Sequence, residues 1–389
     1  MVSSTSKKLS RAKPVLVYLV TEDWYFLSHR VPMASAALAA SYDVHVITHV
    51  NEDGAAIEAL GFHLHPMIWR RGSVNPMSFV MNIRAVRKLY SKLSPDLVHH
   101  VALQPTIVGS LAAVGLPCAR LNALAGLGFV FTSASAKARL ARPFLRALLR
   151  FGLGHERSAV LVQNPDDRAA VRNLGVADDK IFTIGGSGVD LNKLRPLPEA
   201  AGPITAAYIG RLLADKGLRA LIKAHELLNR RGEPVTLLIA GKPDPANPAS
   251  ISDQEIASWA RIPGVRLLGH VADIGDVWKV AHIAVLPSRR EGLPKSLLEA
   301  AAYGRPIVAT DVPGNREIAR QGVNALLVPV DDPSALADAI ARLARDRDLR
   351  RIFGEAGRKF VEERFSADRI GKEIVSLYDR LLDRASSTT

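Results

Sequence analysis

The chain of 389 residues is longer than one ordinary hydrophobic core, so its length predicts two domains. Hydrophobic residues make up 48% and charged residues 23%, which is typical of a globular protein and excludes disordered and fibrous classes. The single cysteine, Cys118, excludes a disulfide framework and a cysteine-based metal site, and favours a reducing compartment. The net charge of +13 predicts an anionic partner, either a phosphorylated ligand or an anionic lipid surface. Nucleic acid is not expected, because no zinc finger, RNP-type aromatic motif or long polybasic tail is present.

The N-terminal segment 1–14 is basic and polar and leads into a short apolar run at 15–20. That run is too short for the core of a signal peptide, and no apolar run approaches the length of a membrane span. We therefore expect a cytoplasmic protein that lies, at most, peripherally at the inner face of the cytoplasmic membrane.

Apolar, β-branched runs alternate with helical patterns along the chain, as in parallel sheets covered on both faces. In the first half the expected strands are 15–20, 43–49, 96–101, 119–125 and 159–164. In the second half they are 204–210, 235–241, 265–271, 283–288, 306–310 and 324–330. We predict an α/β fold with two Rossmann-like, doubly wound domains that face a cleft.

The segment 185–203 is rich in glycine and proline and lacks periodicity, so it predicts a hinge between the two halves. Periodicity alone leaves one larger sheet open, and the hinge argues against it. After residue 333 the pattern becomes helical, and Ser366 is the expected N-cap of the last helix.

The loop GRLLADKG at 210–217 follows an expected strand and carries two cations, Arg211 and Lys216. In open α/β sheets ligands bind at the carboxyl ends of strands, and two cations beside a helix N-terminus suit a diphosphate. The alternative is an ordinary strand-to-helix turn with solvated charges.

The stretch SRREGLPKSLLEAAAYG at 288–304 places two glutamates, Glu291 and Glu299, on either side of Pro294. Proline suits the first helical turn, so the helix should start near Pro294 and stop at Gly304. Glu291 then lies in a loop and Glu299 in the helix, where a solvated glutamate is unexpected among apolar neighbours. A surface loop with a solvated Glu299 is the alternative.

Two further loops of the second half, 267–277 and 240–250, follow expected strands. Backbone at 269–271, including Val271, is placed to contact a base, and the proline-rich loop is long enough to line a cleft. A plain turn explains each equally well.

The motifs GRLLADKG, EGLPKSLLEAAAYGRPIVATDVPGNREI and NALLVPVDDPSALADAI resemble the retaining GT-B glycosyltransferases of family 4, whose two carboxylates form an E-x7-E motif. Segments 21–34, 96–105, 126–131 and 161–168 are similar to a bacterial subgroup that builds surface polysaccharides. The resemblance implies an N-terminal acceptor-binding domain at 1–190 and a C-terminal nucleotide-sugar-binding domain at 191–365. The helix at 366–389 is expected to cross back to the N-terminal domain.

The resemblance also assigns roles in binding a nucleotide-sugar, which is expected to be a UDP derivative. Arg211 and Lys216 would hold the diphosphate and stabilise it as it leaves, while Glu299 would accept hydrogen bonds from the ribose. Glu291 would lie near the donor sugar. Arg211, Lys216 and Glu291 are the residues predicted to be catalytic. The other donor-binding residues implied are Gly210, Val271, Gly292, Leu293, Pro294, Lys295 and Ser296. No metal or other cofactor is implied, because the cations replace magnesium; the catalytic base stays open.

The chain departs from the family at Ala125, where many relatives carry a histidine beside the donor sugar. His29, His99 and His100 are substitutes by position, although a histidine in such a strand is more often a packed core residue. The residues expected to bind the acceptor, a glycan or a lipid-diphosphate-linked sugar, are Trp24, His29, Arg30 and His100. Packing on the next helix is the alternative for this loop.

Arginines recur every three or four residues between Arg139 and Arg150, next to an apolar stripe that includes Phe144 and Phe151. Such a basic amphipathic segment suits anionic lipid, and MIWRRG at 67–72 adds a tryptophan that we interpret as interfacial. A surface helix that packs on its own domain is an equal alternative.

The function predicted is therefore sugar transfer from a nucleotide-sugar to a lipid-linked or growing polysaccharide acceptor. Two rivals remain: an epimerase of UDP-N-acetyl sugars, and a non-catalytic nucleotide-sugar-binding module of a polysaccharide assembly complex. A glycosidase is not expected, because its paired carboxylates must flank one bond.

Overall fold

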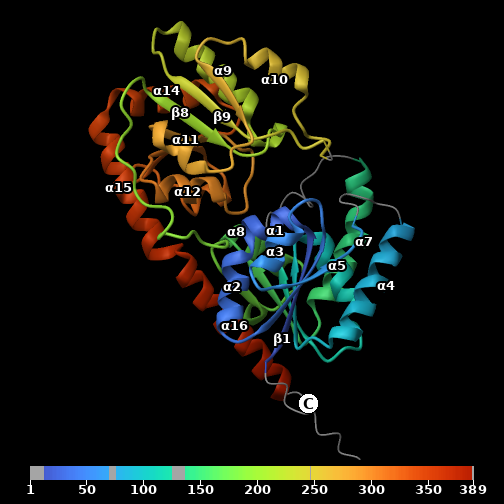
Figure 1. Cartoon of the computed structure of the whole chain (residues 1–389). Coiled ribbons are helices and arrows are strands. Elements are labelled where there is room, and N and C mark those ends of the chain that lie inside the picture. Colours follow the sequence, from blue (N-terminus) through green and yellow to red (C-terminus); the bar gives the residue numbers. More distant parts are fainter. Residues whose placement is uncertain (1–12, 70–75, 125–135, 246, 388–389) are drawn as a thin grey trace, which may run out of the picture.

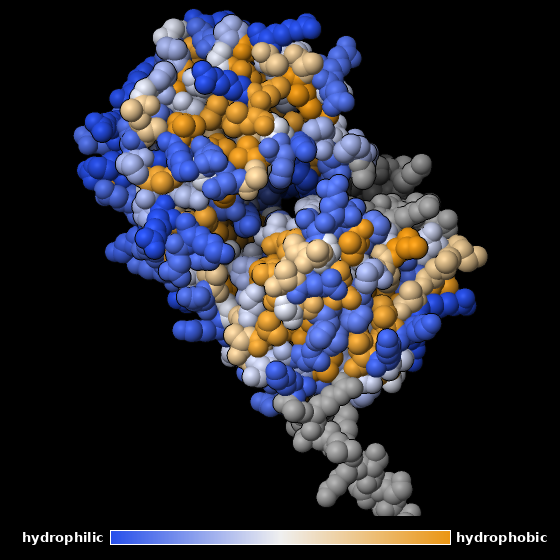
Figure 2. Space-filling view, in the orientation of Figure 1, coloured by the Kyte–Doolittle hydropathy of each residue, from blue (hydrophilic) through white to orange (hydrophobic). Residues whose placement is uncertain are grey.

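The computed structural model describes residues 13–69, 76–124, 136–245 and 247–387, with side chains not described at 136–142 and 385–387. Two parallel sheets form two α/β domains, as the sequence predicts, with a hollow between them (Figures 1 and 2).

The N-terminal domain contains a seven-stranded sheet in the order β3-β2-β1-β4-β5-β6-β7. Its strands are β1 (Val15–Glu22), β2 (Asp43–His49), β3 (His63–Pro66), β4 (Leu97–Val101), β5 (Ala119–Ala123), β6 (Ser158–Val162) and β7 (Ile181–Thr183). Its helices are α1 (Asp23–His29), α2 (Val31–Ala39), α3 (Gly54–Ala59), α4 (Pro76–Leu93), α5 (Leu103–Ala112), α7 (Ala136–Leu153) and α8 (Pro165–Asn173), with a 3-10 turn η1 (Asp178–Lys180). Strands β3 and β7 were not predicted from the sequence. These strands have only four and three residues, too few to show a hydrophobic period.

The C-terminal domain contains a six-stranded sheet in the order β10-β9-β8-β11-β12-β13. Its strands are β8 (Thr205–Ile209), β9 (Thr236–Ala240), β10 (Val265–Gly269), β11 (Ile283–Leu286), β12 (Ile307–Thr310) and β13 (Ala325–Val328). The helices are η2 (Ala214–Lys216), α9 (Leu218–Arg230), α10 (Asp253–Trp259), α11 (Ile274–Val280), α12 (Lys295–Ala302), α13 (Pro313–Arg316), α14 (Pro333–Arg345), α15 (Arg347–Arg364) and α16 (Ala367–Ser387).

The strand order of each sheet reverses direction at one point, between β1 and β4 in one domain and between β8 and β11 in the other. In open parallel sheets, ligands bind outside the carboxyl ends of the strands at such a switch point. In the C-terminal domain the loops that leave β8 and β11 are 210–217 and 287–294, the two loops singled out by the sequence.

Two chain passages connect the domains, and they run side by side. Val189 donates its N–H to Phe365 O at 2.9 Å, and Ala367 donates to Val189 O at 2.9 Å. Gly188 allows this close approach, since a Cβ there would lie 3.0 Å from the Cα of Ala367. Beyond this point Leu191 packs against the C-terminal core, so the hinge is shorter than the segment 185–203 predicted for it.

After this crossing, α16 packs on the N-terminal domain, chiefly against α2 (Figure 1). Ser366 Oγ accepts from Arg369 N at 3.3 Å, which confirms the expected N-cap. The Tyr378 hydroxyl is buried within the N-terminal core, 2.6 Å from the Tyr18 hydroxyl and 2.7 Å from His99 Nδ1. Within the described residues, no helix is both long enough and apolar enough to cross a membrane.

Candidate functional site

The loop after β11 leads into α12, and local sequence explains its geometry. Pro294 is the N-cap, α12 runs from Lys295 to Ala302, and Gly304 follows with a φ of +74°. The predicted separation of the two glutamates is confirmed: Glu291 lies in the loop and Glu299 lies in the helix. The first N–H groups of a helix have no acceptor within the helix, and at the start of α12 these are the N–H groups of Lys295 and Ser296.

Glu291 and Lys216 form an ion pair between the loops of β11 and β8. Lys216 Nζ lies 2.6 Å from Glu291 Oε1, and Ser288 Oγ donates to the same oxygen at 2.6 Å. The Glu291 side chain is only 9% exposed, so this pair is largely shielded from water. Ser288 was not singled out by the sequence analysis, because nothing in one sequence marks a serine as a partner of a residue three positions on.

Gly217 makes this juxtaposition of loops possible. It ends η2 with a left-handed φ of +72°, and a Cβ at this position would lie 1.9 Å from the carbonyl oxygen of Pro287. Only glycine combines that conformation with so close an approach. Lys216 is therefore positioned against the β11 loop by the residue that follows it.

Glu299 is buried, with 9% of its surface exposed, in an apolar stretch of α12. Burial raises the pKa of the Glu299 carboxyl above its usual value, and Lys295, whose Nζ lies 3.3 Å away, opposes that rise. The expectation that Glu299 is not a solvated surface residue is confirmed. A shielded carboxylate of this kind is a strong hydrogen-bond acceptor for a hydroxyl-bearing ligand.

Arg211, at the start of the β8 loop, pairs with a different neighbouring loop from Lys216. Its Nη1 is 2.7 Å from Asp244 Oδ2, and its guanidinium lies 5.7 Å from the ring centroid of Trp24 in the N-terminal domain. Asp244 belongs to the proline-rich loop 240–250, which the sequence analysis expected to line the cleft. The sequence alone did not indicate this pairing of Arg211 with Asp244.

Two cavities occupy the space between the domains. One of about 970 Å³ is lined by residues that include Trp24, Gly210, Arg211 and Val271. The other, of about 1360 Å³, lies against α2 and α16 and reaches Lys295 and Glu299. Ile274 lines both cavities, which places the two groups of predicted donor-binding residues on either side of it.

The other predicted donor residues line neither cavity: Lys216, Glu291, Gly292, Leu293, Pro294 and Ser296. Of these, Gly292 and Leu293 contact the N-terminal domain. Asn164 Nδ2 donates to Gly292 O at 3.0 Å, while its Oδ1 caps α8 by accepting from Asp167 N. A Cβ at Gly186 would lie 2.5 Å from Leu293 Cδ2. Asn164 therefore both caps α8 and bonds to the C-terminal domain across the cleft.

His29 ends α1, near enough to the C-terminal domain for the charges of Lys295 and Arg211 to act on it. Its ring stacks on Tyr25 with centroids 4.4 Å apart, and its Nδ1 lies 2.5 Å from Ser28 Oγ. Burial, followed by the charges of Arg30 and Lys295, lowers the pKa of His29 to about 3, so its imidazole is neutral near pH 7. Arg30 is 3% exposed and its Nε lacks a hydrogen-bond partner within the described residues.

The prediction that His100 binds the acceptor is wrong. His100 is fully buried, with Nδ1 2.8 Å from Asn122 Oδ1 and Nε2 3.1 Å from the Tyr90 hydroxyl. His99 is equally buried against Tyr378. Both occupy a central strand covered on both faces, where even polar side chains are enclosed. Ala125 and the segment 126–131 lie outside the described residues.

The interpretation of Trp69 as an interfacial residue is also wrong, because it is 2% exposed and packs in the core beneath α4. On α7, by contrast, Phe144 is 70% and Phe151 is 58% exposed, so this helix does not direct its whole apolar stripe into the domain. Residues 70–72 and the side chains of Arg139 and Arg142 lie outside the described residues.

Comparison with known proteins places these features in a family. Residues 15–164 match the family model described as glycosyl transferase 4-like, and residues 203–346 match the one described as glycosyl transferases group 1. A capsular polysaccharide biosynthesis glycosyltransferase, CapM of Staphylococcus aureus, is 33% identical over 45% of this chain and 46% of its own length. A diacetylbacillosaminyl-diphospho-undecaprenol α-1,3-N-acetylgalactosaminyltransferase of Campylobacter jejuni is 26% identical over 92% of this chain and 98% of its own.

Among solved structures, Anabaena HepE in complex with UDP and glucose superposes with a TM-score of 0.74 at 17% identity, covering 94% of this chain and 99% of its own. Sucrose-phosphate synthase from Thermosynechococcus elongatus gives a TM-score of 0.78 at 20% identity, covering 95% and 100%. The two family matches together span most of the chain, and the protein belongs to the GT-B glycosyltransferases, with a 4-like N-terminal domain and a group 1 C-terminal domain.

Proposed function

We propose that this protein is a retaining, metal-independent hexosyltransferase that transfers a sugar from a UDP-sugar to a lipid-linked or growing polysaccharide acceptor. One observation carries the proposal. The Lys216–Glu291 pair and the buried Glu299 lie on either side of the start of α12, at the switch point of the C-terminal sheet.

In this proposal the diphosphate of the donor lies against Arg211, Lys216 and the first N–H groups of α12. Fixed cations and helix N-terminal N–H groups favour the charge that develops on the leaving diphosphate, which lowers the barrier to transfer. Lys295 adds a third cation at the helix start. These charges would balance the diphosphate without a metal ion, so turnover is expected to persist in a chelator.

Glu299 accepts hydrogen bonds from the ribose hydroxyls of the donor, and Glu291 lies toward the sugar. Because Glu291 is bonded to Lys216 and Ser288, it acts as an oriented carboxylate whose second oxygen is available to a sugar hydroxyl. We assign no side chain as the catalytic base. In a same-face mechanism the leaving phosphate helps to deprotonate the acceptor, and that mechanism retains the anomeric configuration.

The acceptor is proposed to bind on the N-terminal side of the cleft, near Trp24, His29 and the buried Arg30. The positive charge of Arg30 acts on His29, and a positive charge at this place suits an anionic acceptor, such as a lipid diphosphate. The names of the relatives support this class: one is named for a diphospho-undecaprenol acceptor and another for capsular polysaccharide.

The exposed Phe144 and Phe151 support peripheral binding at the inner face of the cytoplasmic membrane. They lie seven residues apart on α7, which places them on one face of the helix, and Arg146 and Arg150 are exposed on the same helix. Aromatic and basic side chains on one helix are typical of an interfacial segment. Figure 2 shows further hydrophobic surface over α4, where Met77 and Met81 are exposed.

The test is UDP release from a panel of UDP-sugars, with lipid-diphosphate acceptors present and absent. We expect release to fall steeply in Lys216→Ala and in Glu299→Ala. The matched control is Lys223→Ala, which removes an exposed lysine on α9 that lines neither cavity between the domains. Unchanged release in Lys216→Ala and Glu299→Ala would contradict the proposal.

The products separate the proposed transferase from its rivals. An epimerase converts the donor sugar without an acceptor, which NMR of the sugar detects. A non-catalytic module binds UDP and releases none from any donor.

A further inference from the structure

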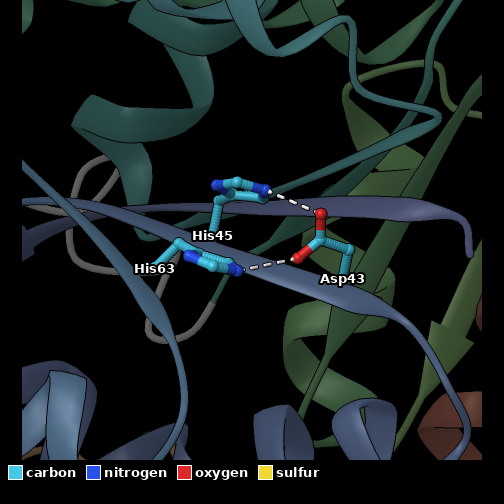
Figure 3. Close-up of side chains that lie close together, drawn as sticks. All are labelled: Asp43, His45 and His63. Carbon is cyan, nitrogen blue, oxygen red and sulfur yellow. Dashed lines mark ion pairs between the residues drawn. The ribbon is translucent and has the colours of Figure 1, made fainter.

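Three ionisable side chains gather at the edge of the N-terminal sheet that lies away from the cleft (Figure 3). Asp43 and His45 are at the start of β2, and His63 begins the neighbouring edge strand β3. The strand register pairs His45 with His63, and side chains two residues apart point to the same face. The pairing of strands thus brings together residues that are 18 positions apart in sequence.

The three side chains direct ligand atoms toward one another. His45 Nε2 lies 3.3 Å from Asp43 Oδ2, and His63 Nε2 lies 3.1 Å from Asp43 Oδ1. These ligand atoms all lie within 4.8 Å of one another. In a tetrahedral zinc site with bonds of about 2.0–2.1 Å, ligand atoms are about 3.3 Å apart. Small side-chain rotations would therefore admit an ion between the carboxylate and the two imidazoles.

His65 provides an outer contact of the kind that metal sites use. Its Nε2 lies 2.8 Å from His45 Nδ1, on the side of the His45 ring away from Asp43. In the tautomer that carries its proton on Nδ1, His45 donates to His65 and leaves the lone pair of Nε2 for a metal. Histidine ligands commonly donate their second ring N–H to a neighbouring acceptor, which fixes the tautomer and the ring orientation.

We propose that Asp43, His45 and His63 bind a divalent transition-metal ion of the zinc class. Two imidazoles and one carboxylate favour zinc over magnesium or calcium, which prefer oxygen ligands. The His63 side chain is 62% exposed and that of Asp43 is 37% exposed, so an ion can enter from solvent and keep a water as its fourth ligand. Among the histidine, cysteine, aspartate and glutamate side chains of the described residues, Asp43, His45 and His63 form the group whose ligand atoms lie close enough together to hold a metal ion.

The ion would tie the edge strand to the rest of the sheet. β3 has only four residues, and it pairs with β2 alone. The cluster lies at the starts of β2 and β3, whereas the cleft lies at their ends, about 20 Å away for a strand of this length. The ion therefore has a structural role, and it is separate from the proposed metal-independent transfer.

The alternative is a cluster of ion pairs, in which each imidazole carries a proton on the Nε2 that faces the Asp43 carboxylate. Metal binding distinguishes the two arrangements, because the metal requires the Nε2 lone pairs that such a cluster uses for protons.

The experiment titrates the full-length, tag-free protein with Co²⁺ alone and follows the visible absorption bands of a four- or five-coordinate ion, with Zn²⁺ as competitor. We expect one Co²⁺ per chain, displaced by Zn²⁺. In His63→Ala, which alters an exposed side chain and should fold, we expect affinity to fall at least about tenfold. In His65→Ala, loss of the outer contact should weaken binding by about 10–100-fold.

The matched control is His155→Ala, a partly exposed histidine in the loop after α7, which should bind Co²⁺ as the unaltered chain does. The melting temperature provides a second measurement: Zn²⁺ should raise it in the unaltered chain and in His155→Ala, but not in His63→Ala. Absence of stoichiometric Co²⁺ binding, or equal binding in His63→Ala, would overturn the proposal.

Discussion

The ammonium group of Lys216 lies 2.6 Å from the carboxylate of Glu291, although 75 residues separate them in the sequence. Both come from loops at the switch point of the C-terminal sheet, and Ser288 holds the same carboxylate oxygen. Two residues that the motif suggests as separate ligands of the donor are thus paired with each other.

This relationship predicts non-additive kinetics. Lys216→Met and Glu291→Gln should each lower kcat/KM for UDP release by about 10²–10³-fold, because each leaves the other charge shielded and unpaired. The double variant should be no worse than the poorer single variant, since residues that act as a unit do not add. Initial rates with saturating acceptor measure all three; losses that multiply would show that the two residues act independently.

Glu299 predicts a pH-dependent donor affinity. Because burial raises the pKa of Glu299, its carboxylate takes up a proton at a higher pH than an exposed glutamate does. Protonation of the carboxylate weakens its hydrogen bonds to the ribose hydroxyls. The KM for the donor should therefore rise as the pH falls toward and below the pKa of Glu299. In Glu299→Gln the KM should already be high and should vary little over that range. A KM profile of Glu299→Gln that follows the unaltered enzyme would contradict this role.

The same shift predicts the stability of the Glu299→Gln variant. A carboxyl whose pKa is higher in the folded than in the unfolded chain stabilises the fold below its unfolded pKa, and that contribution is lost as pH rises through the folded pKa. At pH 7.5 the buried charge thus opposes folding, and Glu299→Gln should melt at a higher temperature than the unaltered chain. The difference should shrink as the pH is lowered to 4. A variant that melts lower at pH 7.5 would show that the Lys295 contact outweighs the cost of burial.

Gly217 and Gly232 provide a matched pair for backbone strain. Both have left-handed φ values, +72° and +70°. A Cβ at Gly217 meets Pro287 O at 1.9 Å, whereas a Cβ at Gly232 has nothing within 4 Å. Gly232→Ala should cost about 1–2 kcal/mol, the penalty for a left-handed alanine. Gly217→Ala should cost more and should also reduce turnover, because it displaces Lys216. Urea denaturation compares the two; equal losses would mean that the contact with Pro287 relaxes freely.

The exposed aromatic residues of α7 predict lipid binding. Replacing both Phe144 and Phe151 with serine should weaken sedimentation with phosphatidylglycerol vesicles by at least about tenfold, because two large apolar side chains no longer insert. The control is Ile352→Ser, which alters a 50% exposed residue on α15 of the other domain. Binding to neutral phosphatidylcholine vesicles should be weak for every variant. Equal sedimentation of the control and the double variant would contradict a lipid-binding role for α7.

The sequence predicted much of the fold, because element type follows from local periodicity. The apolar runs at 15–20 and 283–288 are strands β1 and β11, and the helix after Pro294 begins and ends where its caps indicate. Periodicity needs several residues to show itself, which is why the four-residue β3 escaped detection.

What a side chain contacts was decided by the tertiary structure. His100 was predicted as an acceptor ligand, although a histidine in such a strand is more often a core residue, and the covering of β4 on both faces places it in the core. Trp69 is likewise a core residue, because α4 packs over it. The burial of these two side chains does not follow from local sequence, because it depends on elements that are distant in the chain and pack over them.

The sequence by itself therefore determined two doubly wound domains and the residue types in the loops that follow their strands, and it predicted a hinge between them. The tertiary structure alone decided that Lys216 binds Glu291, that Arg211 binds Asp244, and that His45 faces His63. The physical reason is that short-range pattern fixes φ, ψ and the buried face of each element. Strand order and loop closure, which are non-local, fix which side chains come within hydrogen-bond distance.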